Sequence, residues 1–335
     1  MPCTSGRPRL YYERRGSGEP LLLITGFTIS SAIFEPIRPL YEERFDCISY
    51  DHRGSGRSSA PPLPTSMPEL AGDAVRVLDH LGIQSAHVYG LSMGGMVAQE
   101  MAIRFPDRVR GLVLGCSTAG GPRAIRPTAS EWGALLAAMA GGLREPGRPW
   151  LAGALFSPEF RRDHPERARE LLRFFAAHRA PPHGAWAHLM ASVYHDTVSR
   201  LRCIQAPTLV LHGECDAMAP IANARLIADR IPDAELRVVP GAGHAYGLEK
   251  PEESRDLFVD WFDRRSPIAA GAKRTDPAAS FEPATRALGL PIGALRTGRS
   301  LVGFVADKVS GGRAGTGGEQ RDEGGRHVAV DRRAA

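Results

Sequence analysis

A serine between two glycines is the strongest candidate for a reactive group. Residues 90–94 read Gly-Leu-Ser-Met-Gly and separate an apolar run at 87–89 from a stretch of helical character at 97–105. In a G-x-S-x-G turn the serine occupies a strained position between strand and helix, and its hydroxyl is exposed at the sheet edge. Free N–H groups at the helix N-terminus favour developing negative charge there. We therefore predict that Ser92 is a nucleophile.

A serine hydroxyl needs a base within reach and a group that orients the base. The chain has 11 histidines. His244 follows the strand-like residues 235–239 and a glycine-rich turn at 241–243, which could carry its ring over the sheet edge. It is the predicted base. The other histidines are expected to be structural beside strands (His52, His87, His212), mostly exposed between residues 120 and 200 (His164, His178, His183, His188, His195), or of no specific role (His80, His327).

The predicted acid is Asp216, in the loop that follows the apolar run 208–211. A carboxylate here could hold the imidazole in the right tautomer and stabilise its charged form. Glu214 lies nearby, but it is too close to the end of the strand to reach over the sheet edge. The chain order is then serine, acid, histidine.

Four sequence blocks in this order carry a family resemblance. They are the serine turn at 90–94, Asp-His-Arg-Gly-Ser-Gly-Arg-Ser at 51–58, His-Gly-Glu-Cys-Asp at 212–216 and Gly-Ala-Gly-His at 241–244. Over roughly residues 9–265 the chain resembles the serine-dependent α/β-hydrolases, which include esterases, lactonases, proline iminopeptidases and cofactor-free haloperoxidases. Asp216 and Pro220 match the family pattern H-G-x-x-D-x-x-x-P. Some relatives carry the acid after the sixth strand, but here residues 115–118 contain no carboxylate.

The resemblance also implies an oxyanion hole made of two backbone N–H groups. One belongs to Met93, directly after the nucleophile, and the other by position to Phe27. Relatives usually have His-Gly before the second donor, whereas this chain has Thr25-Gly26. Because the donor is a backbone group, the difference need not abolish the hole. The polar loop 51–58 is expected to hold itself in place, or alternatively to support the oxyanion loop through Asp51 and Arg53.

The remaining pattern predicts the fold class and domain organisation. A weak alternation at 9–15 predicts the opening strand. Mostly apolar segments at 21–24, 45–50, 109–115, 208–211 and 235–239 predict further strands, and 65–81 and 252–264 predict helices. Their alternation predicts a doubly wound, mostly parallel α/β sheet. Residues 1–119 and 201–265 are the expected core. Residues 120–200 have helical spacing and are interpreted as a helical cap inserted after the sixth strand.

Residues 266–335 are rich in Gly, Ala, Pro and Arg and are expected to be largely disordered. Apolar residues over 288–309 fall on one helical stripe beside basic residues. This stripe predicts either a basic amphipathic helix that touches a membrane or partner, or a helix that packs on the body or frays. The second interpretation is preferred because Gly293, Gly298 and Gly303 weaken a free helix.

The net charge of +5 does not indicate a nucleic-acid surface, because the tail holds 11 Lys and Arg against 7 Asp and Glu. The catalytic body is therefore nearly neutral.

No metal-ligand spacing or nucleotide-binding glycine motif is present, so neither a metal nor a cofactor is expected. The five scattered cysteines, the lack of an apolar leader and the lack of a membrane-length apolar run favour the cytoplasm.

These features predict a serine hydrolase that forms an acyl-enzyme on Ser92. Apolar residues of the expected cap favour a small or medium-sized carboxylic ester, lactone or thioester as the small-molecule substrate; they are Trp132, Leu135, Met139, Phe156, Phe174, Phe175, Trp186 and Met190. Perhydrolysis, amide cleavage and carbon–carbon hydrolysis stay open, as do a lyase reaction and a non-catalytic binding role. The sequence gives no oligomeric state.

Overall fold

The computed structural model describes residues 2–60, 64–125 and 149–265 of the chain. The tail 266–335, with its predicted amphipathic helix at 288–309, lies outside the described residues.

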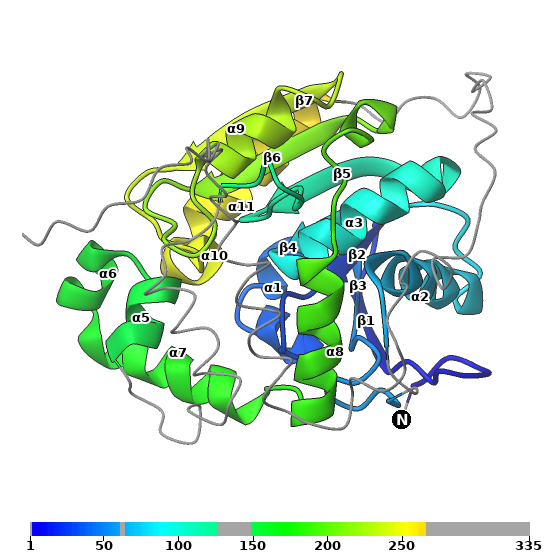
Figure 1. Ribbon diagram of the computed structural model, residues 1–335, viewed down its shortest axis with the longest axis horizontal. Coiled ribbons are helices and arrows are strands. Elements are labelled where there is room, and N and C mark those ends of the chain that lie inside the picture. Colours follow the sequence, from blue (N-terminus) through cyan, green and yellow to red (C-terminus); the bar gives the residue numbers. More distant parts are fainter. Residues whose placement is uncertain (1, 61–63, 126–148, 266–335) are drawn as a thin grey trace, which may run out of the picture. The chain divides into compact units, whose positions relative to one another are not determined.

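A seven-stranded sheet forms the centre of the structure (Figure 1). The strands lie in the order β1-β3-β2-β4-β5-β6-β7, and only β1 runs antiparallel to its neighbour. This confirms the predicted α/β fold with a mostly parallel sheet. The strand bounds are β1 Tyr12–Gly16, β2 Glu19–Ile24, β3 Phe45–Tyr50, β4 Ala86–Leu91, β5 Val109–Gly115, β6 Thr208–Gly213 and β7 Ala234–Val239.

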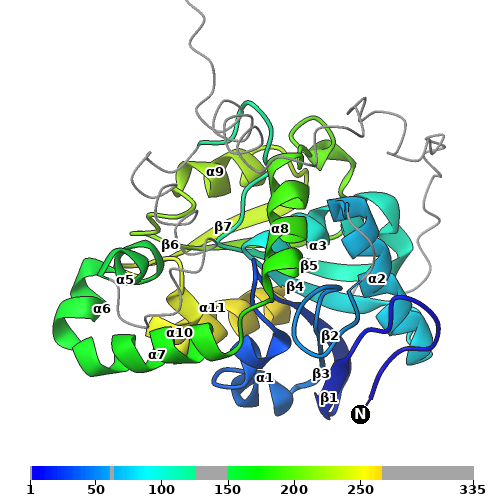
Figure 2. The same ribbon diagram turned by 60° about the horizontal axis from the view of Figure 1, so that its bottom comes forward.

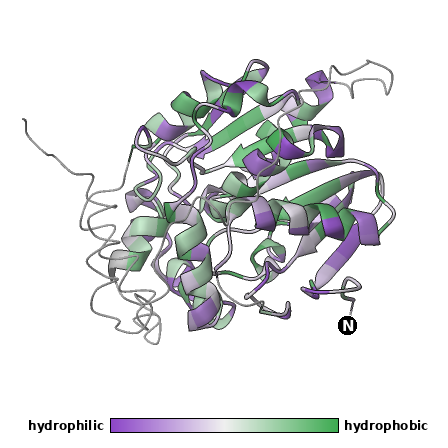
Figure 3. Ribbon diagram, turned by 45° about the vertical axis from the view of Figure 1, so that its right-hand side comes forward, coloured by the Kyte–Doolittle hydropathy of each residue, from purple (hydrophilic) through white to green (hydrophobic). Residues whose placement is uncertain are grey.

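Helices cover both faces of the sheet (Figures 1 and 2). One face carries α2 (Met67–His80), α3 (Met93–Arg104) and α9 (Ala222–Ala228). The other carries α1 (Pro39–Glu42), α10 (Tyr246–Glu249) and α11 (Pro251–Arg264). Because both faces are covered, the strands inside the sheet, β2 to β6, are mostly buried and apolar. Figure 3 shows the central strands mostly in green, with purple concentrated on outer helix faces.

Helix α3 begins at Met93, not at Val97 as the sequence suggested. Two glycines in its first turn lower the intrinsic helix propensity and concealed the true start. Packing decides the outcome, since Met93, Gly94 and Gly95 are all buried against the sheet. The helix therefore starts directly after Ser92.

The described residues between β5 and β6 form helices and no strand, namely α5 (Pro149–Leu155), α6 (Pro158–Asp163), α7 (Pro165–Ala177) and α8 (Pro182–Val193). This helical segment follows β5, the fifth strand of the described chain, whereas the sequence predicts it after a sixth strand. Over the residues that it describes, the structure has one strand, β1, before β2, and five strands in all before the helical segment. Phe156, Phe160, Leu171 and Leu172 form a small apolar cluster of their own.

Two histidines of this insertion are buried, contrary to the expected surface positions. His188 is fully buried, and its Nε2 lies 3.0 Å from the carbonyl oxygen of Arg53. His195 is also buried. Burial lowers the pKa of each to about 4, so both rings are neutral at neutral pH. His164 and His183 are exposed as expected.

All five cysteines are unpaired. Among the helices that the structure describes, none is long and apolar enough to cross a membrane.

Candidate active site

Ser92 occupies the sharp turn between β4 and α3. Its backbone has φ 54° and ψ −117°, a conformation that side-chain-bearing residues rarely adopt. Two hydrogen bonds hold it there: Ser92 N–H donates to the carbonyl oxygen of Gly115 at 2.7 Å, and Ser117 Oγ donates to the carbonyl oxygen of Ser92 at 2.8 Å. Both partners belong to β5 or its end, so the neighbouring strand fixes the turn.

The flanking glycines are required by close backbone contact. A Cβ on Gly90 would lie 2.3 Å from the carbonyl oxygen of Gly94. A Cβ on Gly94 would lie 2.2 Å from that of Ile24. Neither distance is sterically allowed, which explains the glycine at each position of the G-x-S-x-G turn.

Asp216 and His244 form a buried hydrogen-bonded pair. His244 Nδ1 lies 2.9 Å from Asp216 Oδ2 and 3.0 Å from Oδ1. Oδ1 also accepts from the backbone N–H groups of Met218 and Ala219, at 2.9 and 2.8 Å. His212 Nε2 lies 3.2 Å from Oδ2. The carboxylate is thus held from three sides, and Nδ1 of His244 faces it as a donor.

The two groups shift each other's pKa. Burial opposes the charged form of Asp216, but the charge of His244 and hydrogen bonds from both histidines lower its pKa to about 2. Burial likewise acts to lower the pKa of His244, and the charge of Asp216 outweighs it and raises that pKa well above its usual value. Asp216 is therefore ionised, and its charge stabilises the protonated form of His244 beside it.

Glu249 braces the loop that carries His244. Its carboxylate accepts from Gly243 N–H at 3.0 Å, from Ser157 N–H at 3.1 Å and from Ser157 Oγ at 2.7 Å. Burial raises the pKa of Glu249 against these hydrogen bonds. The histidine loop is thereby tied to the start of α6.

The loop after β2 passes directly beside the serine hydroxyl. A Cβ built on Gly26 would lie 3.9 Å from Ser92 Oγ. Within the described chain, no protein acceptor takes the backbone N–H of Phe27 or of Met93. Both groups are free to bind an anionic oxygen near Ser92.

The polar loop 51–58 supports that segment, although not through Arg53. Asp51 Oδ1 accepts from the N–H and hydroxyl of Ser31, at 2.7 and 2.8 Å. His52 Nε2 lies 3.0 Å from the carbonyl oxygen of Thr25. Arg53 instead forms a two-pronged ion pair with Asp73 of α2, at 2.5 and 2.7 Å.

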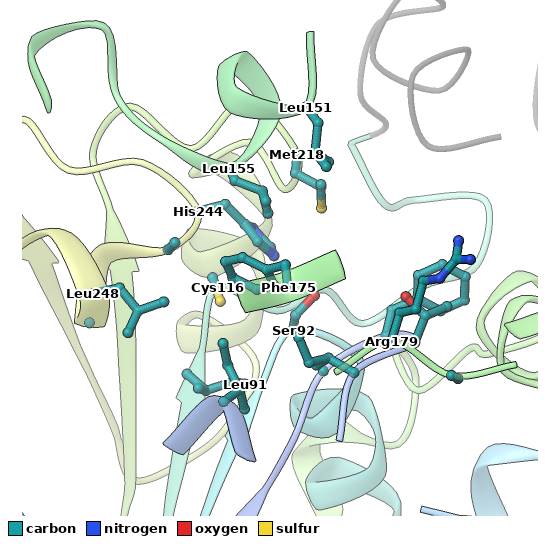
Figure 4. A pocket seen from close by; sticks show the side chains of 18 of the residues that line it. Leu91, Ser92, Cys116, Leu151, Leu155, Phe175, Arg179, Met218, His244 and Leu248 are labelled. Carbon is teal, nitrogen blue, oxygen red and sulfur yellow. The ribbon is translucent and has the colours of Figure 1, made fainter. Parts of the chain in front are cut away.

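Ser92 and His244 line the same cavity, which has a volume of about 940 Å³. Figure 4 shows His244 and Cys116 on one side of Ser92 and Arg179 on the other. The walls are mostly apolar, and residues from α5, α7 and α8 contribute to them. Of the apolar residues named from the sequence, Phe175 lines this cavity. Phe156 packs among neighbouring helices, Phe174 lies against His178, and Trp132, Leu135 and Met139 lie outside the described residues.

Several residues near the serine had no sequence signal. Cys116, with φ 42°, lies beside His244 and interacts with its ring. Tyr89 and Tyr246 share a hydrogen bond of 2.7 Å between their hydroxyls in the cavity wall. Arg179 lines the opposite wall. These contacts join distant parts of the chain, so the local sequence around each residue does not indicate them.

Among the residues that the structure describes, no group of three or more His, Cys, Asp or Glu side chains is placed to hold a metal ion.

Comparison with known proteins identifies the family. The model of the alpha/beta hydrolase fold family matches residues 19–251. The chain is an α/β-hydrolase. It is similar to the poly(3-hydroxyalkanoate) depolymerase of Ectopseudomonas oleovorans, with 30% identity over 245 residues, 73% of this chain and 84% of that protein. It is also similar to 3-oxoadipate enol-lactonase 2 of Acinetobacter baylyi, with 30% identity over 218 residues, 63% of this chain and 76% of that protein.

A solved thermophilic esterase of Thermogutta terrifontis shares the α/β-hydrolase architecture. The two chains are 30% identical, with a TM-score of 0.65, and the match covers 78% of this chain and 96% of the esterase. These relatives support the assignment of the chain as a hydrolase.

Proposed function

We propose that this α/β-hydrolase is a serine hydrolase that cleaves a small or medium-sized carboxylic ester, lactone or thioester through an acyl-enzyme on Ser92. The observation that supports this most is the strained turn at Ser92 opening into the cavity that His244 also lines. His244 is in turn hydrogen-bonded to the buried carboxylate of Asp216. Serine, histidine and aspartate in these roles form a catalytic triad.

In the first half of the reaction, Ser92 Oγ attacks the substrate carbonyl carbon while its proton passes to Nε2 of His244. Asp216 stabilises the imidazolium that forms. The negative oxygen of the tetrahedral intermediate accepts hydrogen bonds from the N–H groups of Met93 and Phe27. The bond to the leaving group breaks as His244 returns the proton to it, and the acyl group stays on Ser92.

In the second half, water gives a proton to His244 and attacks the acyl carbon. The same N–H groups bind the new oxyanion, and the Ser92 Oγ–carbonyl bond breaks. His244 protonates Ser92 Oγ and the carboxylic acid leaves. His244 thus accepts a proton and then returns it in each half of the reaction.

The cavity favours an apolar substrate body. Its volume of about 940 Å³ suits a ligand of small to medium size. Leu151, Leu155, Phe175 and Met218 face this space, so alkyl groups would be buried there.

The same proposal assigns roles to the chain segments. Residues 1–119 and 201–265 are the catalytic core, and residues 120–200 are a helical cap that closes the substrate cavity. The five unpaired cysteines fit a cytoplasmic location.

Hydrolysis of p-nitrophenyl esters with acyl chains from acetyl to dodecanoyl tests the proposal. Wild type should turn over at least the shorter members, and Ser92→Ala should lower kcat by about 10⁴- to 10⁶-fold. Ser199→Ala is the matched control, because Ser199 is exposed and lies outside the cavity wall. Equal activity of wild type and Ser92→Ala would overturn the proposal, as would an inactive wild type.

A further inference from the structure

Arg179 places a single permanent charge in the cavity wall. Among the described residues that line the cavity, the other ionisable side chains are His244, Cys116, Tyr89 and Tyr246. A guanidinium stays charged throughout the physiological range. Most of the other side chains in the wall are aliphatic or aromatic and offer no acceptor to the guanidinium.

The Arg179 side chain also has no partner among the residues that the structure describes. Other arginines of the same helical segment form ion pairs, such as Arg162 with Asp163 at 2.8 Å and Arg167 with Glu170 at 3.2 Å. Arg179 is half-buried, yet no described carboxylate or carbonyl oxygen accepts from its guanidinium. A cation that is partly removed from water without an acceptor is unfavourable. An anionic ligand in the cavity would supply that acceptor.

The backbone fixes Arg179 relative to the oxyanion loop. Ser30 N–H donates to the carbonyl oxygen of His178 at 3.0 Å, and Ala180 N–H donates to that of Thr28 at 2.6 Å. Ile29 and Arg179 face each other in this short antiparallel bridge, and both line the cavity. The loop that carries Phe27 is thus tied to the residue that carries the free cation.

We propose that Arg179 binds a carboxylate of the substrate, so that the substrate is an ester, lactone or thioester with an anionic group remote from the scissile carbonyl. This inference rests on the proposed function and narrows its substrate class. A guanidinium offers two parallel N–H donors to a carboxylate, which gives both affinity and orientation. Because the Arg179 backbone is bonded to the oxyanion loop, this contact fixes the distance from the carboxylate to the oxyanion hole. Binding the carboxylate therefore positions the scissile carbonyl.

Two comparisons of a charged chromogenic ester with a matched neutral one, each called a pair, test the inference; the first is made at three chain lengths. In the first, the p-nitrophenyl hemiesters of adipic, pimelic and suberic acid are compared with p-nitrophenyl alkanoates of equal chain length. In the second, the butyrate ester of 5-hydroxy-2-nitrobenzoic acid is compared with p-nitrophenyl butyrate. The first pair places the carboxylate on the acyl group and the second on the leaving group. The measured quantity is the ratio of kcat/KM for the charged ester to that for its neutral partner.

We expect wild type to prefer the charged ester in at least one pair. Arg179→Met should lower that ratio by about 10- to 100-fold, the usual range for a lost charge-assisted hydrogen bond. Arg179→Lys should lower it less, since the charge is kept and the fork is lost. Arg173→Met is the matched control, because Arg173 lies exposed on α7 away from the cavity and should leave the ratio as in wild type.

The outcomes separate this inference from the proposed function. A ratio that Arg179→Met leaves unchanged in both pairs would overturn the carboxylate site, even if Ser92-dependent hydrolysis is intact. Wild type that prefers the neutral ester in both pairs would do the same. Absence of Ser92-dependent hydrolysis of every ester would instead overturn the proposed function.

Discussion

Replacing Asp216 by asparagine should test the hydrogen-bond network behind His244. In the structure, Oδ1 of Asp216 accepts from two backbone N–H groups, those of Met218 and Ala219, and Oδ2 faces His244 Nδ1. An asparagine would keep its oxygen toward the two backbone donors, so its NH₂ group would face His244. The imidazole would then accept at Nδ1 and carry its proton on Nε2, the atom that must accept from Ser92.

The wrong tautomer should lower kcat/KM by about 10³- to 10⁴-fold, or roughly 4 to 5.5 kcal/mol in the activation barrier. The amide would also point a donor at His212 Nε2, which lies 2.6 Å from the carbonyl oxygen of Ala219 and is expected to donate to it. An unsatisfied buried donor should cost about 1–3 kcal/mol of folding stability. The variant should therefore fold with a modestly lower Tm and be nearly inactive.

The assay is hydrolysis of p-nitrophenyl butyrate at saturating and subsaturating concentrations, well below the Tm of the variant. Glu214→Gln is the matched control, because within the described ranges the Glu214 carboxylate accepts only from Gly241 N–H, at 2.9 Å, in a more exposed position. That variant should retain most of its activity. If Asp216→Asn keeps more than about a tenth of wild-type kcat/KM, or if Glu214→Gln loses as much as it does, the assignment of Asp216 as the orienting acid is wrong.

Three further predictions concern proton binding and backbone packing. Burial acts to lower the pKa of His244, but the carboxylate of Asp216 raises it well above the usual value. The measured kcat/KM should therefore rise with pH through a midpoint above about 6.5. A midpoint below that value would show that burial outweighs the carboxylate. Gly94→Ala should lower the free energy of unfolding, measured in urea, by about 2 kcal/mol or more, because the new Cβ would meet a backbone oxygen. The control Gly72→Ala on α2 has no atom within 4 Å of the new Cβ and should raise that free energy by about 0.5–1 kcal/mol. Burial lowers the pKa of His188 and His195 to about 4, so between about pH 6.5 and pH 4 the unfolded chain binds more protons than the folded chain. Urea titrations should therefore show the free energy of unfolding falling from about pH 6.5 toward pH 4. A flat profile in this range would argue against neutral buried rings.

The sheet was largely predictable because its inner strands, β2 to β6, are mostly buried. Phe45–Tyr50 and Val109–Gly115 have the predicted bounds, since each mostly apolar segment is followed by a polar loop. The start of α3 was misplaced because Gly94 and Gly95 disfavour a helix locally while close packing requires them. Helix α9, Ala222–Ala228, gave no prediction because only seven residues of helix leave little periodicity to detect.

The candidate site was predictable where local sequence carries the geometry. The glycines around Ser92 and before His244 indicate tight turns after strands, and a turn needs few distant contacts to be recognised. The burial of His188 was not predictable, because its partner is a backbone carbonyl 135 residues away. Arg179 was overlooked for the same reason, since its bridge to Ile29 joins two loops that only the folded chain brings together.

Covalent labelling of the serine tests the central claim most directly. Wild type and Ser92→Ala are treated with a fluorophosphonate, and the intact mass and the modified peptide are determined by mass spectrometry. The account predicts one adduct per wild-type chain, located on Ser92, at a rate that falls in His244→Ala, and no adduct on Ser92→Ala. An unlabelled wild type, or an adduct on another residue that persists in Ser92→Ala, would contradict the assignment of Ser92 as the nucleophile.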